Sequence, residues 1–223
     1  MDHDPNVLLN NSGHSNVAVT FSGVNNQVLI EPIKTLQSLI VDVRGDNNKV
    51  HIGSSPRYGH VRMIVQDRSQ VIIGENTTIE QAYLLARDHT SIKVGKDCMI
   101  SFQVDIRTSD AHGFYDLESG ERLNHSQDIE INDHVWIGQG ATLSKGASIG
   151  SGALVGFRCY VQKLSVPANS VVAGSPARVV RTNIIWERNS VENIYRCAEE
   201  ELDPYFLANN PPLKRKRSEL SRL

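Results

Sequence analysis

The chain has 223 residues, a length that suits one domain, or one domain with an appendage, because domains usually hold about 100–200 residues. Lys and Arg number 23 against 25 Asp and Glu, a net charge of −2, so no overall basic charge indicates nucleic acid or an anionic membrane as a partner. The apolar runs are far shorter than the ~20 residues that cross a bilayer, and the polar start does not resemble a secretory signal. We therefore expect a cytoplasmic protein without an integral membrane segment.

Residues 1–70 contain short apolar segments with a loose repeat. Residues 47–53, Asn-Asn-Lys-Val-His-Ile-Gly, match residues 69–74, Ser-Gln-Val-Ile-Ile-Gly, and residues 17–19 and 28–30 are earlier segments of the same kind. Repeated short segments of this type predict coils of a repeat architecture.

Residues 71–106 carry a regular repeat, in which an apolar residue recurs every six positions with a small residue four positions after it. Examples are Ile73-Gly-Glu-Asn-Thr77 and Val94-Gly-Lys-Asp-Cys98. A period of six fits neither an α-helix nor a half-buried strand. Three such hexads therefore predict one triangular coil, and stacked coils predict aliphatic columns inside a prism.

The repeat is interrupted by an insert at residues 107–130. A loop of this length inside a compact repeat is more often functional than idle. The insert holds two histidines, His112 and His125, and the polar and aromatic side chains of Tyr115 and Asp116. Histidine titrates near neutrality and is a frequent general base, although a solvated loop histidine is the alternative interpretation. Asp110 and Asp116 are the carboxylates that could orient such a base.

The hexads resume over residues 131–166, and Trp136 stands at the point where they resume. Tryptophan is too large for the stacked interior, so we expect its ring to point outward at a corner. There it would either pack under the insert or line a groove, since sugars and alkyl chains both pack on flat rings.

Residues 167–223 end the repeat and change period. Gln162 and Lys163 follow the last hexad, and Arg178 and Arg181 stand in Gly-Ser-Pro-Ala-Arg-Val-Val-Arg. We assign residues 1–182 to the repeat domain and residues 183–223 to a helical cap and polar tail. The helix is expected between Asn189-Ser190 and Pro204.

Three blocks together resemble the hexapeptide-repeat acyltransferases: Asp133-His134-Val135-Trp136-Ile137-Gly138, the hexads after it, and residues 166–181. The resemblance covers about residues 70–182 and is strongest to the sugar and capsular-polysaccharide O-acetyltransferases. It implies an all-β, left-handed parallel β-helix with a long loop insertion and a short C-terminal helix. The left hand comes from the resemblance alone, because crossover connections are generally right-handed. A homotrimer with active sites between neighbouring prisms is also implied.

The resemblance further implies site residues, with acetyl-CoA as the co-substrate. His112 matches the catalytic base, which takes the acceptor's proton and returns it to the CoA thiolate, and Trp136 is the second residue expected in the catalytic site. The expected contacts to CoA are Trp136, Gly138, Gly156, Gln162, Lys163, Arg178 and Arg181, since CoA phosphates call for cations. Acceptor contacts are expected from Tyr115, Asp116 and His125. Phe157, Arg158 and Gln162 depart from the family pattern, which usually has small residues and a threonine there.

The leading hypothesis is an acetyl-CoA-dependent O-acetyltransferase acting by direct transfer on a sugar hydroxyl of a capsular or other surface polysaccharide. The alternative is an N-acetyltransferase for an amino-sugar nucleotide. A non-catalytic β-helical scaffold, or a relative of the zinc-dependent carbonic anhydrase of this fold, forms a third class. The hexads carry no matching trio of histidines and the three cysteines are scattered, so no metal is expected.

Overall fold

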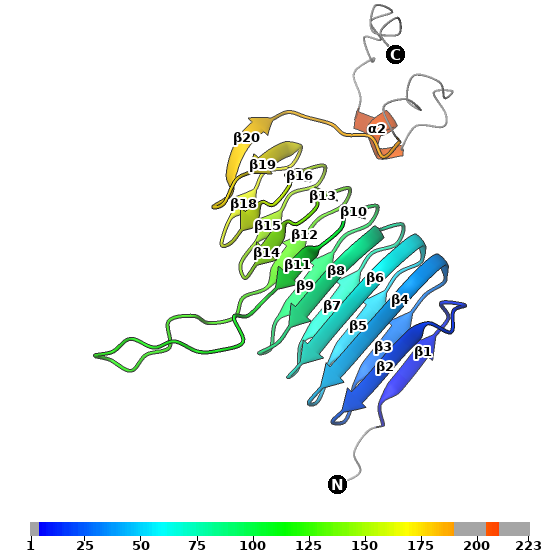
Figure 1. Cartoon of the computed structure of the whole chain (residues 1–223), viewed down its shortest axis with the longest axis vertical. Helices are drawn as coiled ribbons and strands as arrows, with labels where there is room; N and C mark the ends of the chain where they lie inside the picture. Colours follow the sequence, from blue (N-terminus) through cyan, green and yellow to red (C-terminus); the bar gives the residue numbers. More distant parts are fainter. Residues whose placement is uncertain (1–4, 190–203, 210–223) are drawn as a thin grey trace, which may run out of the picture.

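The protein is a three-sided prism of stacked coils, seen in a computed structural model that describes residues 5–189 and 204–209 (Figure 1). The strands pair in parallel from coil to coil, except that β19 and β20 are antiparallel. The predicted all-β parallel helix of hexapeptide repeats is therefore confirmed.

Each coil gives one strand segment to each of three faces. The first face holds β1 (Val7–Asn10), β3 (Gln27–Ile30), β5 (Lys49–Ile52), β7 (Gln70–Ile73), β9 (Ser91–Val94), β12 (Ile129–Ile131), β15 (Ser148–Ile149) and β18 (Ser165–Val166). The second holds β10 (Met99–Ile100), β13 (Trp136–Ile137), β16 (Leu154–Val155) and β19 (Ser170–Ala173), and ends on β20 (Arg178–Thr182). The third holds β2 (Val17–Ser22), β11 (Val104–Arg107), β14 (Thr142–Ser144) and β17 (Tyr160–Val161).

Three longer strands run across both the second and the third face: β4 (Ile33–Arg44), β6 (Ser55–Gln66) and β8 (Thr78–Ala86). In β8, for example, Ile79 pairs with β10 on the second face and Leu84 pairs with β11 on the third. We call the corner between the first and second faces the first corner, that between the second and third the second corner, and that between the third and first the third corner.

The core consists of aliphatic columns, because the apolar residue of each hexad lies in register with its equivalent in the next coil. The first-face column is Ile30, Ile52, Ile73, Val94, Ile131, Ile149 and Val166. The second-face column is Ile79, Ile100, Ile137, Val155 and Val172, and the third-face column is Leu84, Ile106, Leu143 and Val161. All of these side chains are buried, and each contributes about 1.5–3 kcal/mol of transfer free energy.

A buried polar ladder runs along the third corner toward the insert. Asn48 donates to the side chain of Asn26 at 2.9 Å, and Asn48 in turn accepts from the backbone N–H of Ser69 at 3.0 Å. The Ser69 hydroxyl accepts from the N–H of Thr90, whose hydroxyl lies 2.6 Å from that of Thr108 at the base of the insert. Because buried polar groups need partners, this ladder fixes the coil from which the insert leaves.

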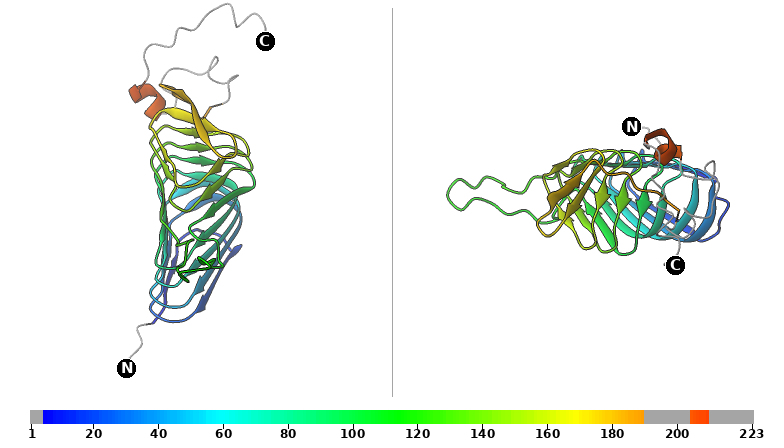
Figure 2. Two further views of the ribbon diagram at one scale, coloured as in Figure 1. Left: turned by 90° about the vertical axis from the view of Figure 1, so that its left-hand side faces the viewer. Right: turned by 90° about the horizontal axis from the view of Figure 1, so that it is seen from above.

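The insert leaves the third corner between β11 and β12 as an arm that projects away from the prism (Figures 1 and 2). Its outer part is a short antiparallel hairpin with a bridge between Tyr115 and Arg122. Backbone hydrogen bonds join Leu123 N to Phe114 O at 2.9 Å and Asp116 N to Glu121 O at 2.8 Å.

The C-terminal segment differs in part from expectation. Residues 184–189 form no regular secondary structure, and the helix expected between Asn189-Ser190 and Pro204 lies outside the described residues. Helix α2 (Pro204–Asn209) begins at the proline where we expected a helix to end, because proline in the first turn needs no N–H partner. None of the described helices is long and apolar enough to span a bilayer.

Candidate active site

Asn124 organises the base of the insert. Its side-chain Nδ2 donates to the carbonyl of His112 at 2.8 Å and to Oδ2 of Asp110 at 2.8 Å. Its Oδ1 accepts from the backbone N–H of Phe114 at 2.9 Å. Both donors and the acceptor of this buried amide are therefore used. They hold the outgoing and the returning segment of the insert together next to His112.

Asp110 joins this arrangement to the body of the prism through a short ion pair with Lys145, which lies on the corner between β14 and β15. The Lys145 side chain is buried. Burial raises the pKa of Asp110, but hydrogen bonds from Lys145 and Asn124 outweigh it, so the pKa lies below its ordinary value. Asp110 is consequently a charged partner of Lys145 at neutral pH.

Asp88, in the coil beneath, forms a second attachment. Its Oδ2 accepts from the hydroxyls of Ser109 at 3.1 Å and Ser126 at 2.7 Å, which lie on the outgoing and the returning segment of the insert. Arg122 approaches the same oxygen at 3.6 Å. Burial raises the pKa of Asp88, but these hydroxyls and the charge of Arg87 bring it below its ordinary value.

The two histidines of the insert, His112 and His125, are both exposed near its base. Among the described residues, neither Asp110 nor Asp116 accepts a hydrogen bond from His112, so the expectation of an orienting carboxylate from one of them is not met within one chain. Asp110 is committed to Lys145 and Asn124. Asp116 instead caps the hairpin turn, since it accepts from Ser119 Oγ at 2.9 Å and from two backbone N–H groups.

Tyr115 lies farther out, and most of its side chain is exposed. A side chain added at Gly113 would come within 2.8 Å of the Tyr115 hydroxyl, so the ring folds back toward the backbone beside His112. The insert thus carries all the expected acceptor contacts: Tyr115 and Asp116 follow His112 on its outgoing segment, and His125 lies on its returning segment.

Three of the residues expected to bind CoA surround one pocket. Gln162, Lys163 and Arg178 line a cavity of about 200 Å³ together with Tyr160 and Leu164. The pocket lies where the third corner meets the segment before β20. Arg181 is exposed farther along β20, opposite Val171, and is not among the lining residues.

Trp136 lies on strand β13, between Met99 and Leu154 of the neighbouring strands, not at a corner as we expected. Its ring points outward because Ile137 occupies the core column, and it remains partly exposed. The aromatic ring that packs against it is Trp186, with ring centroids 5.9 Å apart, so the C-terminal segment and not the insert covers it.

Gly138 and Gly156 stack at the second corner. A Cβ at Gly138 would lie 2.9 Å from the carbonyl oxygen of Val155, and one at Gly156 would lie 3.1 Å from that of Val172. Close stacking of the coils therefore requires both glycines independently of any ligand.

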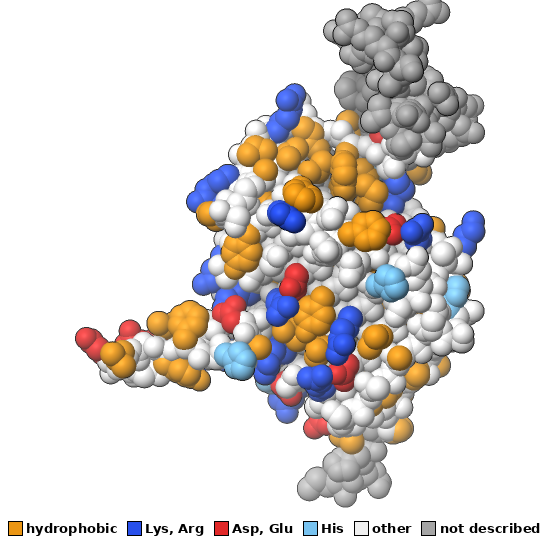
Figure 3. Space-filling model, in the orientation of Figure 1, with side chains coloured by type: hydrophobic (Ala, Val, Ile, Leu, Met, Phe, Trp, Pro, Cys, Tyr) orange, Lys and Arg blue, Asp and Glu red, His pale blue; other side chains and the backbone are white. Residues whose placement is uncertain are grey.

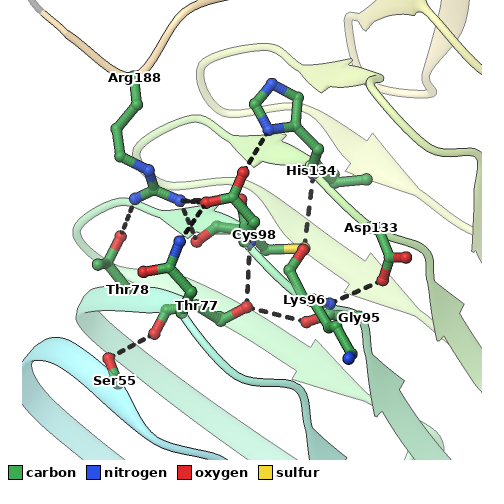
Figure 4. Close-up of polar contacts among 12 residues, drawn as sticks. Ser55, Thr77, Thr78, Gly95, Lys96, Cys98, Asp133, His134 and Arg188 are labelled. Carbon is green, nitrogen blue, oxygen red and sulfur yellow. Dashed lines mark hydrogen bonds and ion pairs between the residues drawn. The ribbon is translucent and has the colours of Figure 1, made fainter. Parts of the chain in front are cut away.

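A cluster that was not predictable from the sequence surrounds His134 at the first corner. The His134 ring is fully buried between Trp186 and Tyr205, with centroids 3.9 and 4.1 Å away. Its Nδ1 lies 2.7 Å from Asp97 Oδ2. Arg188 donates to Asp97 Oδ1 at 2.9 Å. It also donates to the Thr78 hydroxyl at 2.8 Å, as Figure 4 shows. These contacts attach the C-terminal segment to the prism.

Burial raises the pKa of Asp97, but hydrogen bonds from His134 and Arg188 bring it below its ordinary value. Nothing in the hexad pattern distinguishes His134 from a turn residue, because its partners Trp186 and Arg188 are far away in sequence. Among the described residues, no group of three or more His, Cys, Asp or Glu side chains is arranged to hold a metal ion.

One chain therefore brings only part of the predicted site together. The third corner carries the insert with His112, then Lys145, and one coil further Lys163, whose N–H donates to the Lys145 carbonyl at 3.1 Å. Trp136 lies on the second face, which is the face opposite this corner.

Comparison with known proteins agrees with this architecture. No protein-family model matches the chain. The polysialic acid O-acetyltransferase of Neisseria meningitidis is 31% identical over 188 residues, covering 74% of this chain and 87% of the relative. That of Escherichia coli O1:K1 / APEC is 42% identical over 120 residues, covering 54% of this chain but only 39% of the relative's length.

A solved structure has the same fold. The crystal structure of the polySia-specific acetyltransferase NeuO matches with a TM-score of 0.70 at 35% identity, covering 78% of this chain and 80% of that chain. The expected left hand of the β-helix agrees with these neighbours. On the sequence match to the Neisseria enzyme and the shared β-helix, the chain belongs to the hexapeptide-repeat acetyltransferases.

Proposed function

We propose that the protein is an acetyl-CoA-dependent O-acetyltransferase that modifies a sugar hydroxyl of a capsular polysaccharide. The observation that carries the proposal is the combination of two polysialic acid O-acetyltransferases among its relatives with an exposed histidine, His112, on a rigidly attached arm. Polysialic acid itself is the first acceptor to test, because both relatives are named for it.

The chemistry requires a base, since a sugar hydroxyl attacks a thioester efficiently only as its proton is removed. His112 serves as this base by accepting the hydroxyl proton and passing it to the departing CoA thiolate. A direct transfer of this kind needs both substrates to be held at once, and their alignment supplies a large part of the rate. The exposure of His112 leaves its ring open to both substrates.

The pocket of Gln162, Lys163 and Arg178 is our candidate for the phosphate end of CoA. It combines two cations with an amide, and guanidinium and ammonium groups bind phosphates well. CoA supplies the activated acetyl group, and the chain's own residues bind its phosphates, align the acceptor and move the proton.

The site is completed by a second copy of the chain, which we propose to be part of a homotrimer. His112 leaves the third corner and Trp136 lies on the opposite face, so both face one ligand only if they come from neighbouring subunits. The arm carries exposed apolar side chains away from the prism (Figure 3): Phe114, Tyr115, Leu117 and Leu123. Such a surface indicates a protein partner.

The experiment is a thiol-release assay with acetyl-CoA and polysialic acid, other capsular polysaccharides or amino-sugar nucleotides as acceptors. We expect acceptor-dependent thiol release with the polysaccharides, and a loss of about 10²–10⁴-fold in His112→Ala, the range a general base supplies. CoA binding, measured by calorimetry, should persist in the variant. Turnover only with amino sugars would replace the proposal by N-acetylation, and full activity of His112→Ala would refute the role of this histidine.

A further inference from the structure

We propose that Asn124 and Lys145 are positioning residues that hold His112 at its place on the arm. The inference rests on the proposed role of His112 and concerns how the chain fixes that side chain. Its starting point is that His112 is exposed and that neither Asp110 nor Asp116 holds its ring, so its location depends on how its backbone is held.

The backbone of His112 is fixed on its carbonyl side by Asn124, at 2.8 Å. The same amide holds the N–H of Phe114, two residues further on, at 2.9 Å. On the other side of His112, Ala111 has a positive φ of 66°, and its N–H donates to Ser109 Oγ at 3.2 Å. A non-glycine residue at positive φ is held there by its surroundings.

Asn124 in turn depends on Lys145. The second Nδ2 hydrogen of Asn124 donates to Asp110 Oδ2, the atom that also pairs with Lys145 Nζ. Lys145 Nζ lies 3.5 Å from the Asn124 carbonyl as well. The chain of contacts therefore runs from the prism body through Lys145, Asp110 and Asn124 to the backbone of His112.

Asn124 and Lys145 are both buried, so their polar groups depend on partners within the protein. Asn124 is 3% exposed and Lys145 is 4% exposed, and lysine is almost never buried without a partner. Lys145 belongs to a regular hexad, so the prism determines the position of its backbone. Asp110 and the Asn124 carbonyl, both in the insert, are the groups that lie against this cation, so the position of Lys145 constrains the position of the arm.

The consequence is a division of roles within one corner. The apolar columns hold Lys145, and Lys145 with Asn124 sets where His112 stands relative to the substrates. A displacement of about 1 Å at a catalytic group can cost roughly 100-fold in rate, so loss of either residue should lower kcat without removing the groups that bind CoA.

The test compares Asn124→Ala, Lys145→Met and Lys145→Arg in the full-length protein, with Lys49→Met as the control for loss of a lysine. Lys49 is exposed on β5, which β7 and β9 separate from β12 at the end of the insert. We expect kcat to fall about 100-fold in Asn124→Ala and Lys145→Met, with the KM for acetyl-CoA nearly unchanged. Lys145→Arg should recover part of the rate, and Lys49→Met should match wild type.

A pH profile separates positioning from general damage. Because His112 remains the base, the midpoint of the acidic limb of kcat should stay where it is in wild type while the plateau falls. Wild-type kcat in both Asn124→Ala and Lys145→Met would overturn the proposal, and so would an equal loss in Lys145→Met and Lys145→Arg.

A second readout does not depend on turnover. In ¹⁵N-labelled protein, hydrogen exchange of the Phe114 amide reports its hydrogen bond to Asn124 Oδ1. We expect this amide to lose protection in Asn124→Ala and Lys145→Met but not in Lys49→Met. If no acceptor is turned over, the proposed function fails while this exchange rate still decides the positioning claim. Unchanged protection of Phe114 in Lys145→Met would refute it.

Discussion

Different interactions hold the prism body and the insert in place: apolar burial in the body and polar contacts at the base of the insert. In the body, each coil repeats the same apolar position, and a residue such as Leu143 or Ile137 is fully buried in its column. In the insert, Leu117 is 99% exposed. The arm is attached by polar contacts at its base, mainly those of Asp88, Asp110 and Asn124.

This difference determines how mutations act. Stability of the body is spread over many equivalent side chains, so it falls in proportion to the apolar surface removed. The position of the arm depends on a few buried hydrogen bonds, each of which leaves an unsatisfied partner when it is lost. Activity and stability should therefore be separable in this protein.

The largest expected effect tests whether the arm of one subunit and the prism body of its neighbour form one active site. His112→Ala and Trp136→Ala should each be inactive alone. In the proposed homotrimer, a head-to-tail ring that mixes the two variants contains one intact site, so mixed trimers obtained by co-expression with different tags and purified through both should recover about one third of wild-type activity. Full activity of Trp136→Ala alone would mean that Trp136 is not needed, and no recovery in the mixture would mean that the two residues do not share a site across subunits.

The next effect compares the core of the body with the surface of the arm. Leu143→Ala should lower the free energy of unfolding by about 2–5 kcal/mol, because it opens a cavity in a column. Leu117→Ala, of the same chemical size, should leave it unchanged within about 0.5 kcal/mol. Denaturant unfolding followed by circular dichroism measures both, and similar losses in the two variants would contradict the contrast.

A smaller effect concerns the candidate cofactor pocket, which belongs to the body. Arg178→Met should raise the KM for acetyl-CoA by about 10- to 100-fold, the effect of a charge-assisted phosphate contact worth roughly 1.5–3 kcal/mol. Arg181→Met, outside the pocket lining, should change it by less than about threefold. The reverse order would place the phosphates along β20 instead of in the pocket.

The smallest effect is a loosening of the arm in acid. Since the pKa of Asp110 is lowered in the fold, its pairing contributes stability above its ordinary pKa of about 3.9 and loses it as the pH falls through the lowered value. Hydrogen exchange, corrected for intrinsic rates, should show the amides of Phe114 and Leu123 losing protection below about pH 4. The amides of β14 should keep theirs.

Asp110→Asn is the matched variant for that experiment. It should show the reduced protection at Phe114 and Leu123 at every pH, because its amide carries no charge to pair with Lys145. Protection that falls equally in β14 and in the arm would indicate acid unfolding of the whole prism instead.

The fold was predictable from the sequence because each hexad has its own apolar residue at the position that faces the core. The apolar position of every hexad enters a column, as Ile73, Ile106 and Ile149 all do. The insert was visible as a break in the same period. Trp136 was correctly expected to point outward, but its strand position and its contact with Trp186 were not predictable, since the C-terminal segment follows no period.

The amino-acid sequence by itself determined the repeat, the aliphatic columns, the place of the insert and the candidacy of His112, because these depend on local order along the chain. Only the tertiary structure decided that Lys145 is buried, since its hexad places it at a corner, where Asp110 and Asn124 of the insert contact its ammonium group. It also decided that His134 is enclosed by Trp186 and Tyr205, and that Trp136 and His112 lie on opposite sides. Such contacts join residues distant in sequence, and no local period encodes them.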